Sequence, residues 1–130
     1  MLGAVVAVSG ISVLCGWIFD IPLLKSVSSG LATMKVNTAI AFTLIGFALL
    51  FRKPNSSEVS WPVQICAVLA AIIGLFSLAE YALQWDAGID EFFIQDHLTA
   101  VERFPGRPSH MTAFNFAILG IAYLINLSSV

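Results

Sequence analysis

The polar side chains that could carry chemistry in this chain are few, and Glu80 stands out because it lies near the end of a long apolar run. If that run crosses a membrane, a carboxylate costs about 2.5–3.5 kcal/mol at the bilayer centre and less near the interface, so it usually has a partner or a task. Arg103, Arg107 or Lys35 could form a salt bridge with it. A contact with a ligand or a proton is the alternative.

Two asparagines and the residues that follow Glu80 extend this candidate polar network. Asn37 opens the second apolar run, and Asn115 lies about one turn into the fourth. A hydrogen bond between helices or a cap is one interpretation of each, and a ligand contact is the other. The remaining candidates belong to the last link between apolar runs: Trp85, Asp86, Asp90 and Arg107.

Other chemistry is not expected from the residue types present. A bis-histidine haem needs two imidazoles that face each other across a bundle, whereas His97 lies in a link and His110 at a predicted helix start. Cys15 and Cys66 lie inside apolar runs at opposite depths, so neither a disulfide nor a metal site is predicted. The sequence also lacks a nucleophile, a glycine-rich phosphate loop and a basic nucleic-acid patch. We expect no cofactor, no nucleic-acid partner and no catalysis by this chain itself.

The elements that hold these residues are predicted to be membrane helices. The 130 residues are 58% hydrophobic and 11% charged, with a mean hydropathy of +0.91, which is too little charge to cover a small soluble domain. A bilayer core takes about 20 apolar residues per helix. We predict one all-α domain over residues 1–130, with four transmembrane helices at about 2–19, 38–51, 61–83 and 111–127.

Basic residues and tryptophans indicate how these helices are oriented. Arg52 and Lys53 lie in the short link between the second and third runs, and positive charge favours the cytoplasmic side. Both termini are then cytoplasmic, the two longer links face outward, and the protein belongs in a bacterial cytoplasmic membrane. Trp17, Trp61 and Trp85 fall near the ends of runs, as residues of an interfacial aromatic belt do.

An internal repeat divides the domain into two helical hairpins. Residues 34–48 match residues 108–122 at a constant offset of 74. Hairpins of about 2–53 and 61–127 would bury together what one alone cannot. Because each hairpin has an even number of helices, the two copies are predicted to be parallel repeats related by an axis along the membrane normal.

Small residues recur at matching positions of the two hairpins. Gly10 and Gly74 correspond in the first helix of each hairpin. Small residues let helix backbones approach closely, which is how helices associate in lipid. The predicted packing positions in the second helix of each hairpin are Gly46, Ala48, Gly120 and Ala122.

The longest link is predicted to hold a short helix in the outer interface, within residues 86–103. Ile89, Phe92 and Phe93 share a helical spacing, while Asp90 lies largely on another face, which suits a helix at the lipid surface. The first link would be its shorter counterpart, and the two could cover a pocket at the outer mouth of the bundle. They could equally be simple loop anchors.

Three short motifs follow one another along the chain: Met34-Lys35-x-Asn37-Thr38-Ala39, Glu80-Tyr81…Trp85-Asp86-x-Gly88-Ile89-Asp90, and Pro105-Gly106-Arg107-x-Ser109-x-x-Thr112-Ala113. Together they resemble the amino-terminal membrane region of bacterial sensor histidine kinases and diguanylate cyclases. The resemblance implies an input module that continues into cytoplasmic kinase or cyclase domains, with a homodimer formed through that downstream segment. That family often has Met-Ser-Pro-Asn-Thr-Ala in its second repeat, whereas residues 108–113 read Pro-Ser-His-Met-Thr-Ala here, so no role of that asparagine is carried over.

The leading hypothesis is therefore a membrane input or anchoring module of a signal-transduction protein. It would sense an unknown stimulus at its outer half: a lipophilic ligand such as a quinone or a lipid, or a mechanical property of the bilayer. One alternative is a structural accessory subunit of a larger membrane complex. Another is a small transporter or channel subunit, which needs a polar line through the centre of the bundle.

Overall fold

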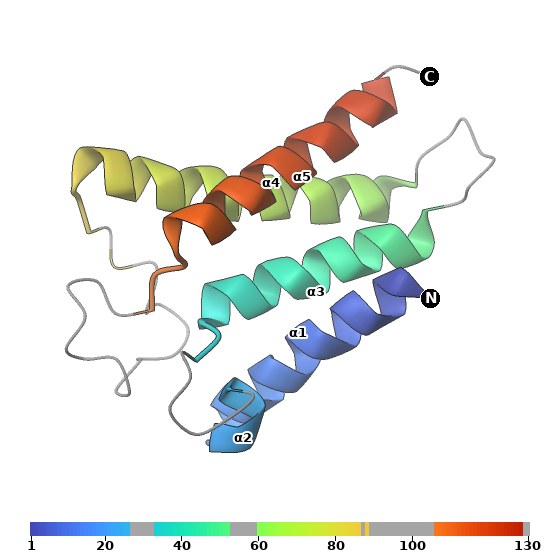
Figure 1. The fold of residues 1–130 in the computed structure, drawn as a ribbon. Coiled ribbons are helices and arrows are strands. Elements are labelled where there is room, and N and C mark those ends of the chain that lie inside the picture. Colours follow the sequence, from blue (N-terminus) through green and yellow to red (C-terminus); the bar gives the residue numbers. More distant parts are fainter. Residues whose placement is uncertain (27–32, 53–59, 87, 89–105, 129–130) are drawn as a thin grey trace.

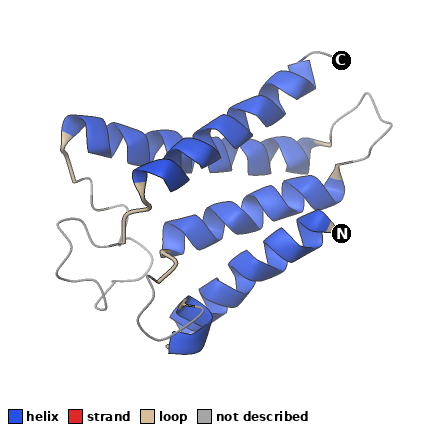
Figure 2. Cartoon of the chain, in the orientation of Figure 1, coloured by secondary structure: helices blue, strands red, loops and turns tan. Residues whose placement is uncertain are grey.

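The computed structural model describes residues 1–26, 33–52, 60–86, 88 and 106–128. This part of the chain is built from helices joined by loops, with no strand (Figures 1 and 2). The all-α prediction is confirmed. The helices are α1 (Leu2–Ile18), α2 (Pro22–Lys25), α3 (Val36–Phe51), α4 (Trp61–Leu83) and α5 (His110–Ser128).

The four long helices lie on the four predicted apolar runs, and their starts follow local rules. Pro62 sits in the first turn of α4, where its missing N–H would be unbonded in any case. The backbone N–H of Thr112 donates to the Ser109 hydroxyl at 3.2 Å, which caps the start of α5. The side chain of Ser60, by contrast, makes no cap hydrogen bond at the start of α4.

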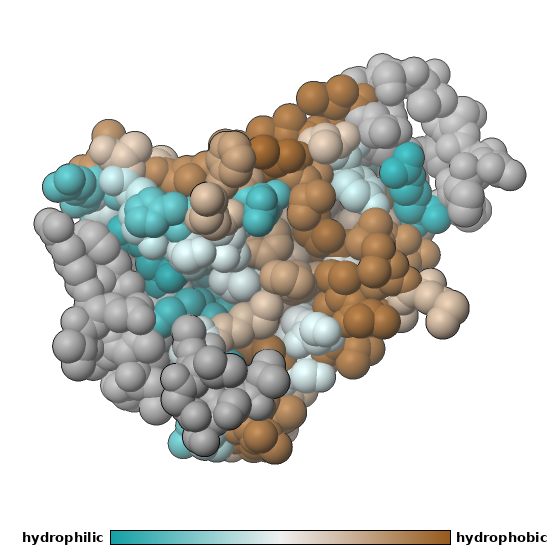
Figure 3. All heavy atoms as spheres, viewed as in Figure 1, coloured by the Kyte–Doolittle hydropathy of each residue, from teal (hydrophilic) through white to brown (hydrophobic). Residues whose placement is uncertain are grey.

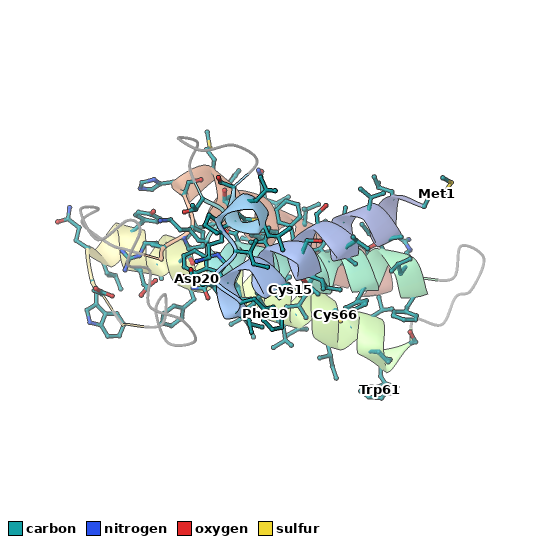
Figure 4. All side chains as sticks on the ribbon, turned by 90° about the horizontal axis from the view of Figure 1, so that it is seen from below. Met1, Cys15, Phe19, Asp20, Trp61 and Cys66 are labelled. Atoms are coloured by element: carbon teal, nitrogen blue, oxygen red, sulfur yellow. The ribbon has the colours of Figure 1, made fainter. Side chains whose placement is uncertain are left out.

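The helices form two antiparallel hairpins, α1 with α3 and α4 with α5, and α3 packs against α4 between them. In Figure 1 both α1 and α4 end at the side where α3 and α5 begin, and this side is called the polar end below. Met1, the last residues of α3 and the end of α5 lie at the opposite end. In Figure 4, Met1 and Trp61 accordingly lie toward one end of the molecule, and Phe19 and Asp20 toward the other.

Close backbone contacts repeat between the hairpins at the predicted offsets. A Cβ at Gly10 would lie 2.7 Å from the Ala39 oxygen, and a Cβ at Gly74 would lie 2.6 Å from the Ala113 oxygen. Ala39 and Ala113 differ by the offset of 74 found in the sequence. The two hairpins are thus the same packing unit, in which glycine allows the helices to touch through their backbones.

The predicted small residues of α3 and α5 are used unequally. A Cβ at Gly46 would lie 2.3 Å from the Ala7 backbone nitrogen, and one at Gly120 would lie 2.6 Å from the Ala71 Cβ. Two residues beyond each glycine the copies differ, because Ala48 is fully buried whereas its equivalent in α5 is exposed. Ala122 therefore takes no part in the packing within the chain.

Small side chains lie inside this bundle and large apolar ones outside. Nine of the fourteen buried apolar residues in the described part of the chain are alanines. Phe116 is one of the large exceptions, and its ring meets Phe42 edge-on at 5.5 Å, joining α5 to α3. Exposed leucine, isoleucine, valine and phenylalanine side chains lie along α1, α4 and α5 and at the end of α3, and brown, hydrophobic residues cover much of the face in Figure 3.

Helix length separates α4 from the others. Among the described residues, α4 is the one helix that is long and apolar enough to cross a membrane, with 23 residues. The apolar helices Leu2–Ile18, Val36–Phe51 and His110–Ile125 are shorter. The prediction of four membrane spans therefore stays a prediction. The predicted interfacial helix within residues 86–103 lies almost wholly outside the described residues, which resume at 106.

Candidate functional site

The polar end holds a buried ion pair between Glu80 and Arg107. Both residues are almost fully enclosed, with exposed fractions of 1% and 3%. An Arg107 guanidinium nitrogen lies 3.4 Å from a Glu80 carboxylate oxygen. Of the three cations that the sequence offered as partners of Glu80, the structure places Arg107 beside it, whereas Arg103 lies outside the described residues.

Arg107 also gathers the first residues after α4. The same guanidinium nitrogen donates to the Trp85 backbone oxygen at 3.2 Å and lies 3.7 Å from an Asp86 carboxylate oxygen. The chain turns back here because Gln84 adopts a left-handed conformation, with φ of 49°, and the Trp85 N–H donates to the Glu80 backbone oxygen at 3.1 Å. This turn brings four predicted site residues together: Glu80, Trp85, Asp86 and Arg107.

Tyr81, which the sequence offered as part of a motif and not as a candidate site residue, completes the cluster. Its hydroxyl donates to the Pro108 backbone oxygen at 2.8 Å. The Arg107 guanidinium lies 5.2 Å from the centre of its ring, and the His110 imidazole stacks on it at 3.6 Å between centroids. Tyr81 thereby fixes the end of α4 to the start of α5.

The first hairpin builds the same arrangement from other residue types. The Trp17 indole N–H donates to the Met34 backbone oxygen at 2.9 Å, and the Lys25 ammonium lies 4.6 Å from the Trp17 ring centre. Trp17 and Tyr81 differ by 64 residues, as Gly10 and Gly74 do, and the two acceptors differ by 74. This offset is the sequence signal that could have found Tyr81. We call each arrangement of aromatic donor, carbonyl acceptor and cation an aromatic clamp.

Trp17 was predicted to be an interfacial belt residue, and that assignment is wrong. Its side chain is buried, with 6% exposed, because it is the donor of the first clamp. Trp61 and Trp85, by contrast, are 71% and 56% exposed.

An ion pair with a strongly exposed acid accompanies the first clamp. Lys25 is buried and pairs with Asp20, whose side chain is 90% exposed. The hydrogen bond from Lys25 and its positive charge hold the pKa of Asp20 below its usual value of 3.8. Asp20 has a φ of 53°, and the following N–H, of Ile21, donates to the Gly16 oxygen at 2.8 Å. This is the same turn as the one at Gln84.

A cavity of about 440 Å³ opens beside the second clamp, where α3 and α5 begin. It is called the polar cavity below. Its two walls are equivalent segments of the two repeats, because residues 33–38 and 107–112 differ by the offset of 74. The lining residues are Thr33, Met34, Lys35, Thr38, Tyr81, Arg107, Ser109, His110 and Thr112. Hydrophilic residues gather over the same part of the molecule in Figure 3, near the starts of α3 and α5.

A second cavity of about 360 Å³ adjoins the first and is called the apolar cavity below. Thr112 lines both cavities, and the apolar one continues along α3 and α5 away from the polar end. Its lining residues are Phe42, Thr112, Asn115, Phe116, Ile118 and Leu119.

The remaining predicted site residues differ in burial and in the elements that hold them. Asn37 is buried in the first turn of α3 and lines neither cavity in the described part of the chain. Asn115 is exposed on α5 and lines the apolar cavity. Asp90 and His97 lie outside the described residues.

Cys15 and Cys66 are separate free thiols.

Comparison with known proteins found no similar one. No family model, curated protein or solved structure matches the chain.

Proposed function

We propose that this chain is the membrane input module of a bacterial signal-transduction protein, and that occupancy of the polar end is what it senses. Four helices, α1, α3, α4 and α5, would cross the cytoplasmic membrane, with the polar end outward and both termini in the cytoplasm. Output domains of the kinase or cyclase type would follow residue 130.

The observation that carries the membrane part of the proposal is the distribution of side-chain size. In water, large apolar side chains drive folding by being buried. Here alanines form most of the core, and large apolar side chains face outward along α1, α4 and α5. Lipid suits this arrangement, because helices in a bilayer associate through close packing of small residues rather than through a hydrophobic drive.

The lengths of the helices fit a membrane with some adjustment. The bilayer core takes about 17–25 residues per helix, and α1 and α3 have 17 and 16. Short helices are accommodated by local thinning of the bilayer and by flanking polar groups that reach the interface. Exposed Phe19 and Trp61, at opposite ends of the molecule (Figure 4), would lie in the two interfaces.

The location of the polar residues supports sensing more than transport. The buried polar and charged side chains of the described residues are Lys25, Asn37, Thr38, Ser77, Glu80 and Arg107. They belong to α2, to the first turn of α3, to the last two turns of α4 and to the loop before α5, so they gather at one end and form no line along the bundle. A transport path would need polar groups at mid-membrane.

The mechanism follows from where the polar cavity lies. Its walls are the starts of α3 and α5, so a bound ligand would change the distance between these two helices. Shifts of about 1–2 Å are enough to bias two-state elements attached to a helix. The edge-on contact of Phe42 with Phe116 would transmit the shift from one repeat to the other. Motion of α5 would then reach the output domains.

The test compares the full-length protein with a variant that lacks residues 1–130 but keeps a generic membrane anchor. Both are reconstituted in nanodiscs, and kinase or cyclase output is measured while membrane lipids and quinones are added. We expect output to respond in the full-length protein and not in the deletion variant. An unchanged response in the deletion variant would leave anchoring as the only role of this chain.

A further inference from the structure

We propose that the polar and apolar cavities together form one binding site for an amphiphile with an anionic head and an alkyl chain. The anionic oxygens would lie in the polar cavity and the chain in the apolar one. This inference rests on the proposed function, since it names the ligand class that the input module would bind.

The lining of the polar cavity favours a negatively charged head. Lys35 and Arg107 contribute positive charge, and none of the described lining residues is acidic. Glu80 and Asp86 lie near Arg107, so a change at Lys35 removes positive charge from the cavity lining without breaking that ion pair.

Hydrogen-bond donors in the same cavity also suit anionic oxygens. The buried hydroxyl oxygen of Thr33 has no hydrogen-bond partner among the described residues, and buried polar atoms rarely remain so. Thr38 brings a second hydroxyl to the wall. Both α3 and α5 begin at this cavity, and the first N–H groups of a helix carry partial positive charge.

The apolar cavity fits the chain of the same molecule. It is lined by two phenylalanine rings and by Ile118 and Leu119, which are about half exposed at the outer face of α5. Ile118 and Leu119 are six and seven residues beyond Thr112, which places them about 9–10 Å farther along the helix. The head would thus lie at the polar end and the chain would point toward the membrane centre, the order that a lipid has in one leaflet of a bilayer.

The volumes of the two cavities suit one bound ligand rather than a layer of non-specifically associated lipids. Binding pockets for small molecules usually measure about 300–1,000 Å³, and each cavity alone falls within or near that range. Thr112 belongs to both linings, so the proposed ligand would pass this residue between its head and its chain. Phosphatidylglycerol, with a phosphodiester head, and oleate, with a carboxylate head, are two molecules of this class.

The experiment measures binding to the chain in an uncharged detergent by native mass spectrometry. Phosphatidylglycerol and oleate distinguish a phosphodiester head from a carboxylate head. Phosphatidylcholine tests the need for net negative charge, and inorganic phosphate tests the need for an alkyl chain. We expect one molecule of phosphatidylglycerol or oleate to bind per chain, at least tenfold more tightly than phosphatidylcholine, and no competition from equimolar inorganic phosphate.

Variants with matched controls locate the site. Lys35→Gln should weaken binding about tenfold, since a hydrogen bond to a charged group is worth at least that much. Arg52→Gln removes the same charge at the opposite end and should leave binding unchanged. Thr112→Phe fills the junction of the cavities and should abolish binding, whereas Met111→Phe, at an exposed neighbour that lines neither cavity, should not. Circular dichroism confirms that each variant is folded.

The proposal is overturned if phosphatidylcholine binds as tightly as the anionic amphiphiles, if inorganic phosphate competes equally, or if Lys35→Gln and Arg52→Gln weaken binding to the same extent. These outcomes differ from failure of the proposed function, because the binding assay contains no output domain. Loss of anionic binding with an intact output response would discard the ligand class alone. Binding without any effect of the ligand on output would discard the sensing role instead.

Discussion

The two hairpins close the polar end with the same aromatic clamp but with different acids. In the first, Trp17 donates to a backbone carbonyl, and the cation over its ring pairs with Asp20, which is exposed. In the second, Tyr81 makes the equivalent hydrogen bond, and the cation over its ring pairs with Glu80, which is buried. One ion pair therefore faces solvent and the other is enclosed.

The difference has a steric cause. Glu80 occupies the position that Gly16 has in the first hairpin, 64 residues earlier. A Cβ at Gly16 would lie 2.7 Å from the Leu24 Cβ, because α2 packs directly against it. The first hairpin thus fills the space beside its clamp with α2, and its acid is displaced to the helix end. The second hairpin fills the equivalent space with a carboxylate and its partner. A duplicated scaffold therefore holds one robust clamp and one that depends on a buried charge pair.

The largest expected effect tests this dependence directly. Glu80→Ala should lower the free energy of unfolding by about 3–5 kcal/mol, because it leaves the Arg107 charge buried without its carboxylate. Asp20→Ala, the matched change in the first hairpin, should have a much smaller effect because that carboxylate is exposed. Unfolding in mixed micelles of sodium dodecyl sulfate, followed by circular dichroism, measures both.

A double variant separates lost charge from lost packing. Glu80→Gln combined with Arg107→Gln removes both charges, keeps the length of the side chain at 80 and shortens the one at 107, so it should be more stable than Glu80→Ala alone, which leaves a buried charge unpaired. If the two single variants Glu80→Ala and Asp20→Ala were equally destabilised, the distinction between the clamps would be wrong.

The arrangement of helices could be predicted from the sequence, and the details of the clamps could not. Long apolar runs in a chain with so little charge leave helices as the only elements that satisfy their own backbone hydrogen bonds in lipid. The offset of 74 then gave the hairpins and their close contacts at Gly46 and Gly120. Both conclusions depend on patterns that extend over many residues, so single local exceptions such as Ala122 do not disturb them.

The sequence pattern could not show which cation pairs with Glu80, because Arg107 lies 27 residues farther along the chain. The pairing depends on the left-handed turn at Gln84, and neither glutamine nor aspartate, at the equivalent Asp20, is a strong signal for that conformation. Trp17 was misassigned for a related reason. An aromatic residue near the end of an apolar run can lie in an interfacial belt or act as a buried hydrogen-bond donor. The position of the next helix determines which of the two it does.

The next largest effect concerns the packing that the hairpins share. Gly46→Ala and Gly120→Ala should each lower the free energy of unfolding by about 1–3 kcal/mol, because the new methyl group would overlap the facing helix. Gly46→Ala should have the larger effect, since the contact at 2.3 Å is with backbone. Ala122→Leu, at an exposed position of α5, is the control and should be nearly neutral. A loss in only one hairpin would show that the repeats do not pack alike.

A smaller effect is expected from the donors of the two clamps. Tyr81→Phe keeps the ring and removes the hydroxyl that bonds the Pro108 oxygen, so it should destabilise the chain by about 0.5–1.5 kcal/mol. Trp17→Phe should cost more than this, because it removes part of a buried ring together with the bond to the Met34 oxygen. Thermal unfolding of both variants gives the comparison, and a neutral Tyr81→Phe would mean that the cation and the stacked His110 alone hold the second clamp.

The smallest effect is the pH dependence of the first clamp. Because Lys25 lowers the folded-state pKa of Asp20, the pair stabilises the chain above the usual value of 3.8, and this contribution disappears as the pH falls from there through the lower folded-state pKa. The difference in unfolding temperature between the native chain and Asp20→Asn should therefore be constant and small above about pH 5 and should vanish at the acid end. The carboxylate is almost wholly exposed, so salt should reduce this difference as well. A difference that instead grew on acidification would mean that the protonated carboxyl, rather than the ion pair, stabilises the end of α1.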